Sequence, residues 1–161
     1  MSAPRPLART DYEREVLQHV ETHGWHCTSV SGGESGQTPP FAYSVGLHAG
    51  HGAPEFIVFG LDGAVAHSIL STCADAYLSG DGFDLDAPCH DLVNGYPCRF
   101  VRVPPARAEE HAYTALWFHG GAGFPLYQVA WPDVDGRFPW EAGVRASFRA
   151  LQPVLGEAPT D

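Results

Sequence analysis

One stretch of sequence decides the fold, FAYSVGLHAGHGAPEFIVFGL at residues 41–61. In Phe41–Leu47 large apolar residues alternate with small ones, which is typical of a strand with one bulky and one small face. The run Glu55–Leu61 is almost continuously apolar, which favours a central strand covered on both faces. His48–Pro54 is rich in glycine and predicts a loop. With no helix between them, the two strands are expected to pair antiparallel.

Helix signals flank this strand pair on both sides. Thr10 and the glutamate three residues later have the spacing of a capping box, and Gly24 is a natural stop for that first helix. Asp62 is a suitable N-cap for a second helix, Gly63–Leu78. A third helix is expected over Ala106–His119, after two prolines.

The remaining apolar segments complete a single α+β domain. Residues 1–9 and 153–161 are expected to be flexible tails around a domain that spans residues 10–152. Consecutive strands without intervening helices favour a mostly antiparallel sheet, which can take a split-barrel-like form and is flanked by about three helices. The further strands predicted are Trp25–Val30, His90–Val93, Tyr96–Val103 and Phe124–Trp131.

The charge balance excludes several functions. The chain has a formal net charge of −10, and all nine of its basic residues are arginine. A P-loop lysine, a Schiff-base lysine and a lysine-linked pyridoxal phosphate are therefore impossible. Nucleic acids and anionic membranes are not expected as partners, because both are bound through clustered cationic side chains. This lysine-free, acidic composition, rich in Ala, Gly and Pro, is typical of a GC-rich bacterial genome.

The four cysteines show no C-x-x-C spacing, so the sequence contains no zinc-ribbon or dithiol redox motif. The N-terminus lacks the apolar segment of a secretory signal, and no apolar run has the length of a membrane span. We therefore expect four reduced thiols in a cytoplasmic protein.

Two motifs resemble a known bacterial family. Residues 41–61 join a tyrosine-containing strand ending in Val-Gly-Leu to a Gly-His turn, a Pro-Glu dipeptide and an apolar strand. WPDVDGRFPW, at residues 131–140, looks like a second signature. Together they resemble the bacterial domain-of-unknown-function family 4262, although one extra residue separates His51 from Pro54. The resemblance implies no established activity. The order of elements is also similar to the split barrel of flavin-reductase-like proteins, but no flavin motif accompanies it.

The glycine-rich loop contains the candidate reactive residues. Histidine titrates near neutrality, so His51 oriented by Glu55 is a candidate catalytic acid–base pair. His48 and His51 are also suitable metal ligands, and His67, His119 or Glu55 would complete a set. A metal site needs three or four ligands that converge on one ion. The spacing of histidines in a loop does not establish such convergence, so no metal site is predicted. Exposed loop histidines and a glutamate that merely begins a strand are the simpler interpretation.

The aromatic segment is the best candidate for a binding pocket. Trp131 and Trp140 would form apolar walls, and Arg137 would contact an anion; a lid over the core is the alternative interpretation. The ligand would lie between this segment, the His48–Pro54 loop and the small face of the strand before it. The residues expected to bind it are Tyr43, Ser44, His48, Trp131, Arg137 and Trp140.

Two functions fit these features. The first is a small-molecule-binding or enzymatic domain that uses this pocket, for which no motif identifies a cofactor. The second is a non-catalytic protein-interaction module, of the immunity or accessory kind, whose acidic surface would meet a basic protein partner. A pocket lined by His51 and tryptophans would favour the first, and a flat acidic face with fully buried tryptophans would favour the second.

Overall fold

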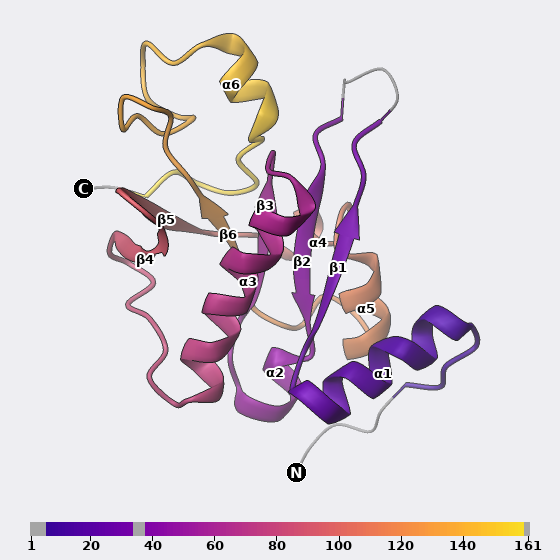
Figure 1. The fold of residues 1–161 in the computed structure, drawn as a ribbon. Coiled ribbons are helices and arrows are strands. Elements are labelled where there is room, and N and C mark those ends of the chain that lie inside the picture. The colour runs from indigo at the N-terminus through magenta and orange to yellow at the C-terminus, as the bar shows by residue number, and fades with distance from the viewer. Residues whose placement is uncertain (1–5, 34–37, 160–161) are drawn as a thin grey trace.

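A six-stranded mixed sheet organises the chain in a computed structural model that describes residues 6–33 and 38–159 (Figure 1). The strand order is β1-β2-β3-β6-β5-β4, and among the described strands β3 and β6 form the one parallel pair. The sheet is open, with β1 and β4 at its edges, and is not closed into a barrel. The α+β class is therefore confirmed. The strands are β1 His26–Val30, β2 Phe41–Val45, β3 Glu55–Phe59, β4 Cys89–Val93, β5 Tyr96–Arg102 and β6 Leu126–Ala130.

Two long helices and four short ones accompany the sheet in the described residues. Both predicted caps are present, since Thr10 accepts a hydrogen bond from Glu13 N and Asp62 accepts one from Val65 N. None of these helices has the length and apolar character needed to cross a bilayer. The helices are α1 Asp11–His23, α2 Leu47–His51, α3 Gly63–Leu78, α4 Pro105–Ala108, α5 Tyr113–His119 and α6 Ala146–Leu151.

The core lies on both faces of the sheet. Alternate residues of β3 point to opposite faces, as expected for a strand. Phe56 belongs to a cluster built with α3, whereas Ile57 belongs to a second cluster that includes residues of α1 and α5. All five residues of β3 are buried. The prediction of a central strand covered on both faces is therefore confirmed, with α3 in front of the sheet and α5 behind it in Figure 1.

Two predicted segments differ from the structure. The loop His48–Pro54 contains most of the short helix α2, which begins directly after Gly46. The single helix predicted over Ala106–His119 is divided into α4 and α5, because Ala112 leaves the helical conformation with φ −94° and ψ 54°. This stretch contains no glycine or proline that would have marked the break.

Residues 131–152 form a lobe beyond the end of β6, drawn in orange and yellow in Figure 1. The lobe is closed at its base by Gln152, whose side chain is fully buried. Its Oε1 accepts a hydrogen bond from Trp131 N at 2.9 Å, and its Nε2 donates one to Trp131 O at 2.8 Å. The packed chain continues past the predicted boundary at 152, because Leu155 is buried and its N–H donates to Gln128 Oε1.

Candidate functional site

A buried carboxylate is the centre of the candidate site. Glu55, the first residue of β3, has no solvent exposure. Its Oε1 accepts hydrogen bonds from Ser44 Oγ at 2.8 Å and Leu47 N at 3.3 Å. Its Oε2 accepts from Gly46 N at 2.8 Å and His48 N at 3.3 Å. A carboxylate buried in this way needs such donors, since an unpaired buried charge is strongly destabilising.

His119 supplies a fifth donor from a distant part of the chain. Its Nε2 lies 2.7 Å from Glu55 Oε2, across 64 residues of sequence. The ring is the last residue of α5 and lies against Phe118 and Phe124, with ring centroids 5.0 and 4.7 Å away. The side chain of His119 keeps 9% of its surface exposed, whereas that of Glu55 keeps none. The imidazole is therefore the part of the pair that solvent reaches.

Gly46 makes the convergence of backbone donors possible. Its φ of 103° is a conformation that residues with a side chain rarely adopt. A Cβ at this position would also lie 2.7 Å from Val20 Cγ2 of α1. The chain therefore turns sharply from β2 into α2, and three successive N–H groups face one carboxylate. Such a concave arrangement of amides is a recognised anion-binding geometry.

The partners of two imidazoles assign their tautomers. A backbone carbonyl can only accept, so His48 Nδ1, 3.1 Å from Ala53 O, carries the proton. A carboxylate also accepts, so His119 Nε2 is the donor to Glu55. In the neutral rings, His48 Nε2 and His119 Nδ1 then hold the lone pairs. The two rings meet edge to face with their centroids 5.8 Å apart.

Comparison with known families assigns most of the chain, including this site, to one family. The sequence model of a family described as a domain of unknown function (DUF4262) matches residues 19–145, which is most of the chain. The chain belongs to the DUF4262 family. The resemblance predicted from residues 41–61 and 131–140 is thus confirmed, and the matched span includes both Glu55 and His119. No curated protein and no solved structure matches this DUF4262 chain.

Three of the predicted site residues of this DUF4262 domain lie together. Ser44, His48 and Glu55 form one hydrogen-bonded group. The side chain of His51 lies outside the described part of the structure, so the predicted pair of His51 and Glu55 stays a prediction. Tyr43 is buried in the core, where its hydroxyl accepts a hydrogen bond from Thr114 N at 3.0 Å.

The small face of β2 is covered by neighbouring segments of the same chain. Ala42, Ser44 and Gly46 are all buried. Ala42 packs in the cluster that α3 completes, and Gly46 lies against Val20 of α1. The small side chains therefore admit neighbouring helices of the same chain.

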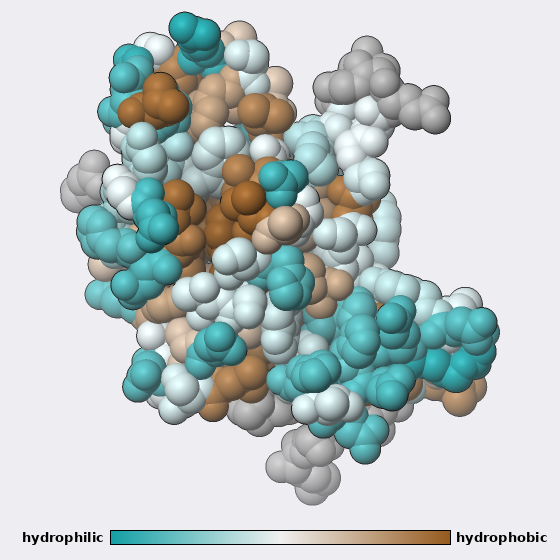
Figure 2. Space-filling model, in the orientation of Figure 1, coloured by the Kyte–Doolittle hydropathy of each residue, from teal (hydrophilic) through white to brown (hydrophobic). Residues whose placement is uncertain are grey.

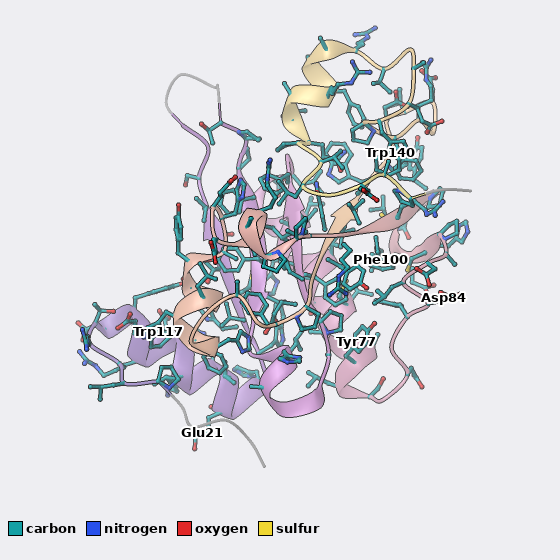
Figure 3. The ribbon with its side chains drawn as sticks, turned by 180° about the vertical axis from the view of Figure 1, so that it is seen from behind. Glu21, Tyr77, Asp84, Phe100, Trp117 and Trp140 are labelled. Atoms are coloured by element: carbon teal, nitrogen blue, oxygen red, sulfur yellow. The ribbon has the colours of Figure 1, made fainter. Side chains whose placement is uncertain are left out.

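The other predicted residues lie at the opposite end of the sheet. β3 and β6 run parallel with Glu55 opposite Leu126, so Trp131, which follows β6, lies beyond the far end of both strands. A strand of this length spans about 16 Å. Trp131 Nε1 donates to Phe59 O at that end, and Figure 3 shows Trp140 in the lobe, far from Trp117 of α5. The single predicted pocket is thus divided between two regions.

The sequence indicates His119 only as an additional metal ligand and gives no signal of its contact with Glu55. The contact joins residues that are 64 positions apart in the sequence. The one local signal is the Gly-Gly pair directly after His119, which indicates that His119 ends a helix. In residues 6–33 and 38–159, no three His, Cys, Asp or Glu side chains are grouped so that they could hold a metal ion.

Proposed function

We propose that this DUF4262 domain is a small-molecule enzyme in which His119 acts as a general base and Glu55 positions it. The observation that carries the proposal is the 2.7 Å contact between His119 Nε2 and the buried Glu55 carboxylate. A carboxylate that accepts from one ring nitrogen fixes the tautomer and the orientation of the ring. The other nitrogen, Nδ1, is then available to take a proton from water or from a substrate hydroxyl.

The hydrogen bonds around Glu55 support this role. Four donors besides His119 hold the two carboxylate oxygens, so the carboxylate cannot rotate away from the ring. When Nδ1 takes a proton, the ring becomes positively charged beside this fixed negative group. Preorganised charge of this kind stabilises charge that develops during a reaction, because no reorganisation of solvent is needed.

Ser44 has a positioning role in this proposal. Its hydroxyl donates to Glu55 Oε1 and accepts from Phe56 N at 2.9 Å, and the residue has no exposure. It therefore has no access to a substrate carbonyl. We infer a reaction in which an activated water or substrate hydroxyl is the nucleophile, with the half-buried His48 ring as a second polar group beside His119.

The variant His119→Gln tests the proposal directly. The amide nitrogen of glutamine can occupy the place of Nε2 and still donate to Glu55, but glutamine has no basic nitrogen. We expect unchanged thermal stability and a loss of at least about 100-fold in the hydrolysis of small activated esters such as para-nitrophenyl acetate. His90→Gln, an exposed position on β4, is the matched control and should retain the wild-type rate. Equal rates for the two variants would disprove the role of His119.

The alternative is a non-catalytic interaction module, which the net charge of −10 favours. None of the four tryptophans is fully buried, which supports the ligand-binding proposal over a flat acidic face. The two functions differ in a measurable way. The alternative predicts salt-sensitive binding of a basic protein, with no ester hydrolysis above the rate of free imidazole.

A further inference from the structure

The lobe contains a pocket that is separate from the Glu55–His119 pair. Its volume is about 500 Å³, within the range of sites that hold small organic ligands. Trp131, Phe148, Leu151 and Val134 supply most of its apolar wall. Figure 2 shows apolar residues on the side of the lobe and between the lobe and α3. The pocket lies at the opposite end of β3 and β6 from Glu55.

The aromatic wall of this pocket is rigid. Trp131 uses its N–H, its carbonyl and its indole N–H in hydrogen bonds to Gln152 and to Phe59 O. Phe148 of α6 meets the indole edge to face, with ring centroids 5.2 Å apart and planes at 83°. A preformed aromatic wall binds a flat apolar group without an entropic cost for ordering side chains.

Apolar side chains also face solvent at this pocket. Val134 is 84% exposed and Leu151 is 41% exposed, although the chain buries many smaller apolar residues. An exposed apolar patch beside a pocket is a common feature of ligand sites. A ligand that covers these side chains would remove their apolar surface from water.

One of the two arginines at the pocket is available to an anion. Arg137 is neutralised by Asp135, with Nη2 3.0 Å from Oδ2, and by Asp133, with Nε 3.8 Å from Oδ2. The charge of Arg137 is therefore balanced within the lobe, and the anion contact predicted for it stays a prediction. Arg145 lines the pocket, is exposed, and forms no ion pair with any residue that the structure describes. The Arg145 guanidinium is therefore available to an anion that enters the pocket.

We propose that the lobe binds a small monoanion with a flat apolar body, of the aromatic carboxylate class. The body would lie against Trp131 and Phe148, and the carboxylate would pair with Arg145, whose guanidinium matches the geometry of a carboxylate. Val134 and Leu151 would cover the outer side of the ligand. This site does not depend on the proposed reaction, because none of its residues touches Glu55 or His119.

Naphthoate is a suitable probe, because it combines a flat apolar body with one carboxylate. NMR signals of the four indole N–H groups report on its position. We expect naphthoate to shift the Trp131 signal and to leave those of Trp25 and Trp117 unchanged. The neutral analogue naphthalenemethanol should bind about fivefold more weakly, since an exposed ion pair contributes up to about 1 kcal/mol.

Two variants and two controls complete the experiment. Arg145→Gln should weaken naphthoate about fivefold and leave the neutral analogue unchanged, and Val134→Asp should weaken naphthoate by repulsion. Arg14→Gln, on α1, and His119→Gln should both bind naphthoate as the wild type does. The proposal is overturned if naphthoate leaves the Trp131 signal unchanged, or if Arg145→Gln and Val134→Asp bind it with wild-type affinity.

Discussion

Ser44 connects the candidate site to the strand pairing that surrounds it. Its hydroxyl donates to Glu55 Oε1 and accepts from Phe56 N, both in the buried core. Ser44→Ala would remove a donor to a charged group and leave a buried N–H unpaired. We expect the free energy of unfolding to fall by about 3 kcal/mol, measured by urea titration.

Ser68→Ala is the matched control for this prediction. Ser68 is exposed on α3, and alanine is the better helix former, so stability should change by less than about 0.5 kcal/mol. An equal effect of the two substitutions on the free energy of unfolding would show that the hydrogen bonds of Ser44 make no net contribution to stability.

Gly46→Ala separates backbone strain from steric overlap when it is compared with Gly120→Ala. Both glycines have positive φ, 103° and 75°. The Cβ added at residue 46 would lie 2.7 Å from Val20 Cγ2, whereas residue 120 has no heavy atom within 4 Å of that position. We expect a loss of about 1 kcal/mol at Gly120 and about 3 kcal/mol at Gly46, by thermal or urea unfolding. Similar losses at the two positions would contradict an overlap with α1.

At the scale of elements, α1 docks on β1 through a small polar network. The hydroxyl of Tyr12 lies 3.0 Å from His26 Nε2 and 2.8 Å from Thr28 Oγ1. His19 Nδ1 lies 2.8 Å from His26 Nδ1. One of these two nitrogens must therefore be unprotonated, so that it can accept a hydrogen bond from the other. Burial, and secondarily the nearby His19, lower the pKa of His26 from 6.5 to about 4, with Glu15 opposing the shift.

This lowered pKa makes the docking of α1 sensitive to acid. Between pH 6.5 and about 4 the unfolded chain binds a proton at His26 that the folded chain does not. The contribution of His26 to stability is therefore complete above about pH 6.5 and is lost as the pH falls toward 4, by at most about 3 kcal/mol because solvent screens part of the interaction. His26→Gln should remove that part of the pH dependence, as measured by unfolding at several pH values. His90→Gln should retain it, and a wild-type slope in His26→Gln would contradict this origin.

The elements predicted best were those with local end signals. α1 and α3 begin at the predicted caps because the Thr10 and Asp62 side chains act within one helical turn. The division of Ala106–His119 into α4 and α5 could not be predicted, because it follows from packing over the sheet and has no breaking residue. The small helix α2 depends on Glu55, which holds its first amides from the neighbouring strand.

At the scale of the molecule, one parallel strand pair explains why Trp131 and Glu55 lie apart. In a sheet that is antiparallel throughout, Trp131 at the end of β6 would lie beside Glu55 at the start of β3. The observed parallel pairing places it at the far end. The chemistry of their side chains is enough to single out Ser44, His48 and Glu55 in the sequence, and these three residues lie together in the structure. The contact of His119 with Glu55 and the separation of the lobe depend on the tertiary arrangement, which the sequence pattern does not show.

The reactivity of the four cysteine thiols indicates whether the core of the domain is packed. All four are free. Burial raises the pKa of the Cys27 thiol to about 11 and that of Cys98 to about 12, and Cys73 and Cys89 are also raised. Because thiolates are the reactive species, we expect less than one equivalent of fast reaction with Ellman's reagent in the native protein at mildly alkaline pH. Four should react in concentrated urea, and rapid native reaction of two or more would contradict this packing.

Gln152 has a consequence for how the family can diversify. Its amide holds both main-chain groups of Trp131, so the chain leaves and re-enters the body of the domain at one point. Loop-closure entropy rises by only about 0.6 kcal/mol for each doubling of length, so the intervening residues can be lengthened, shortened or exchanged at small cost. The family match ends at residue 145, before α6 and this clasp. Changes in the length of the segment between Trp131 and Gln152 therefore need not disturb the sheet or the carboxylate at its other end.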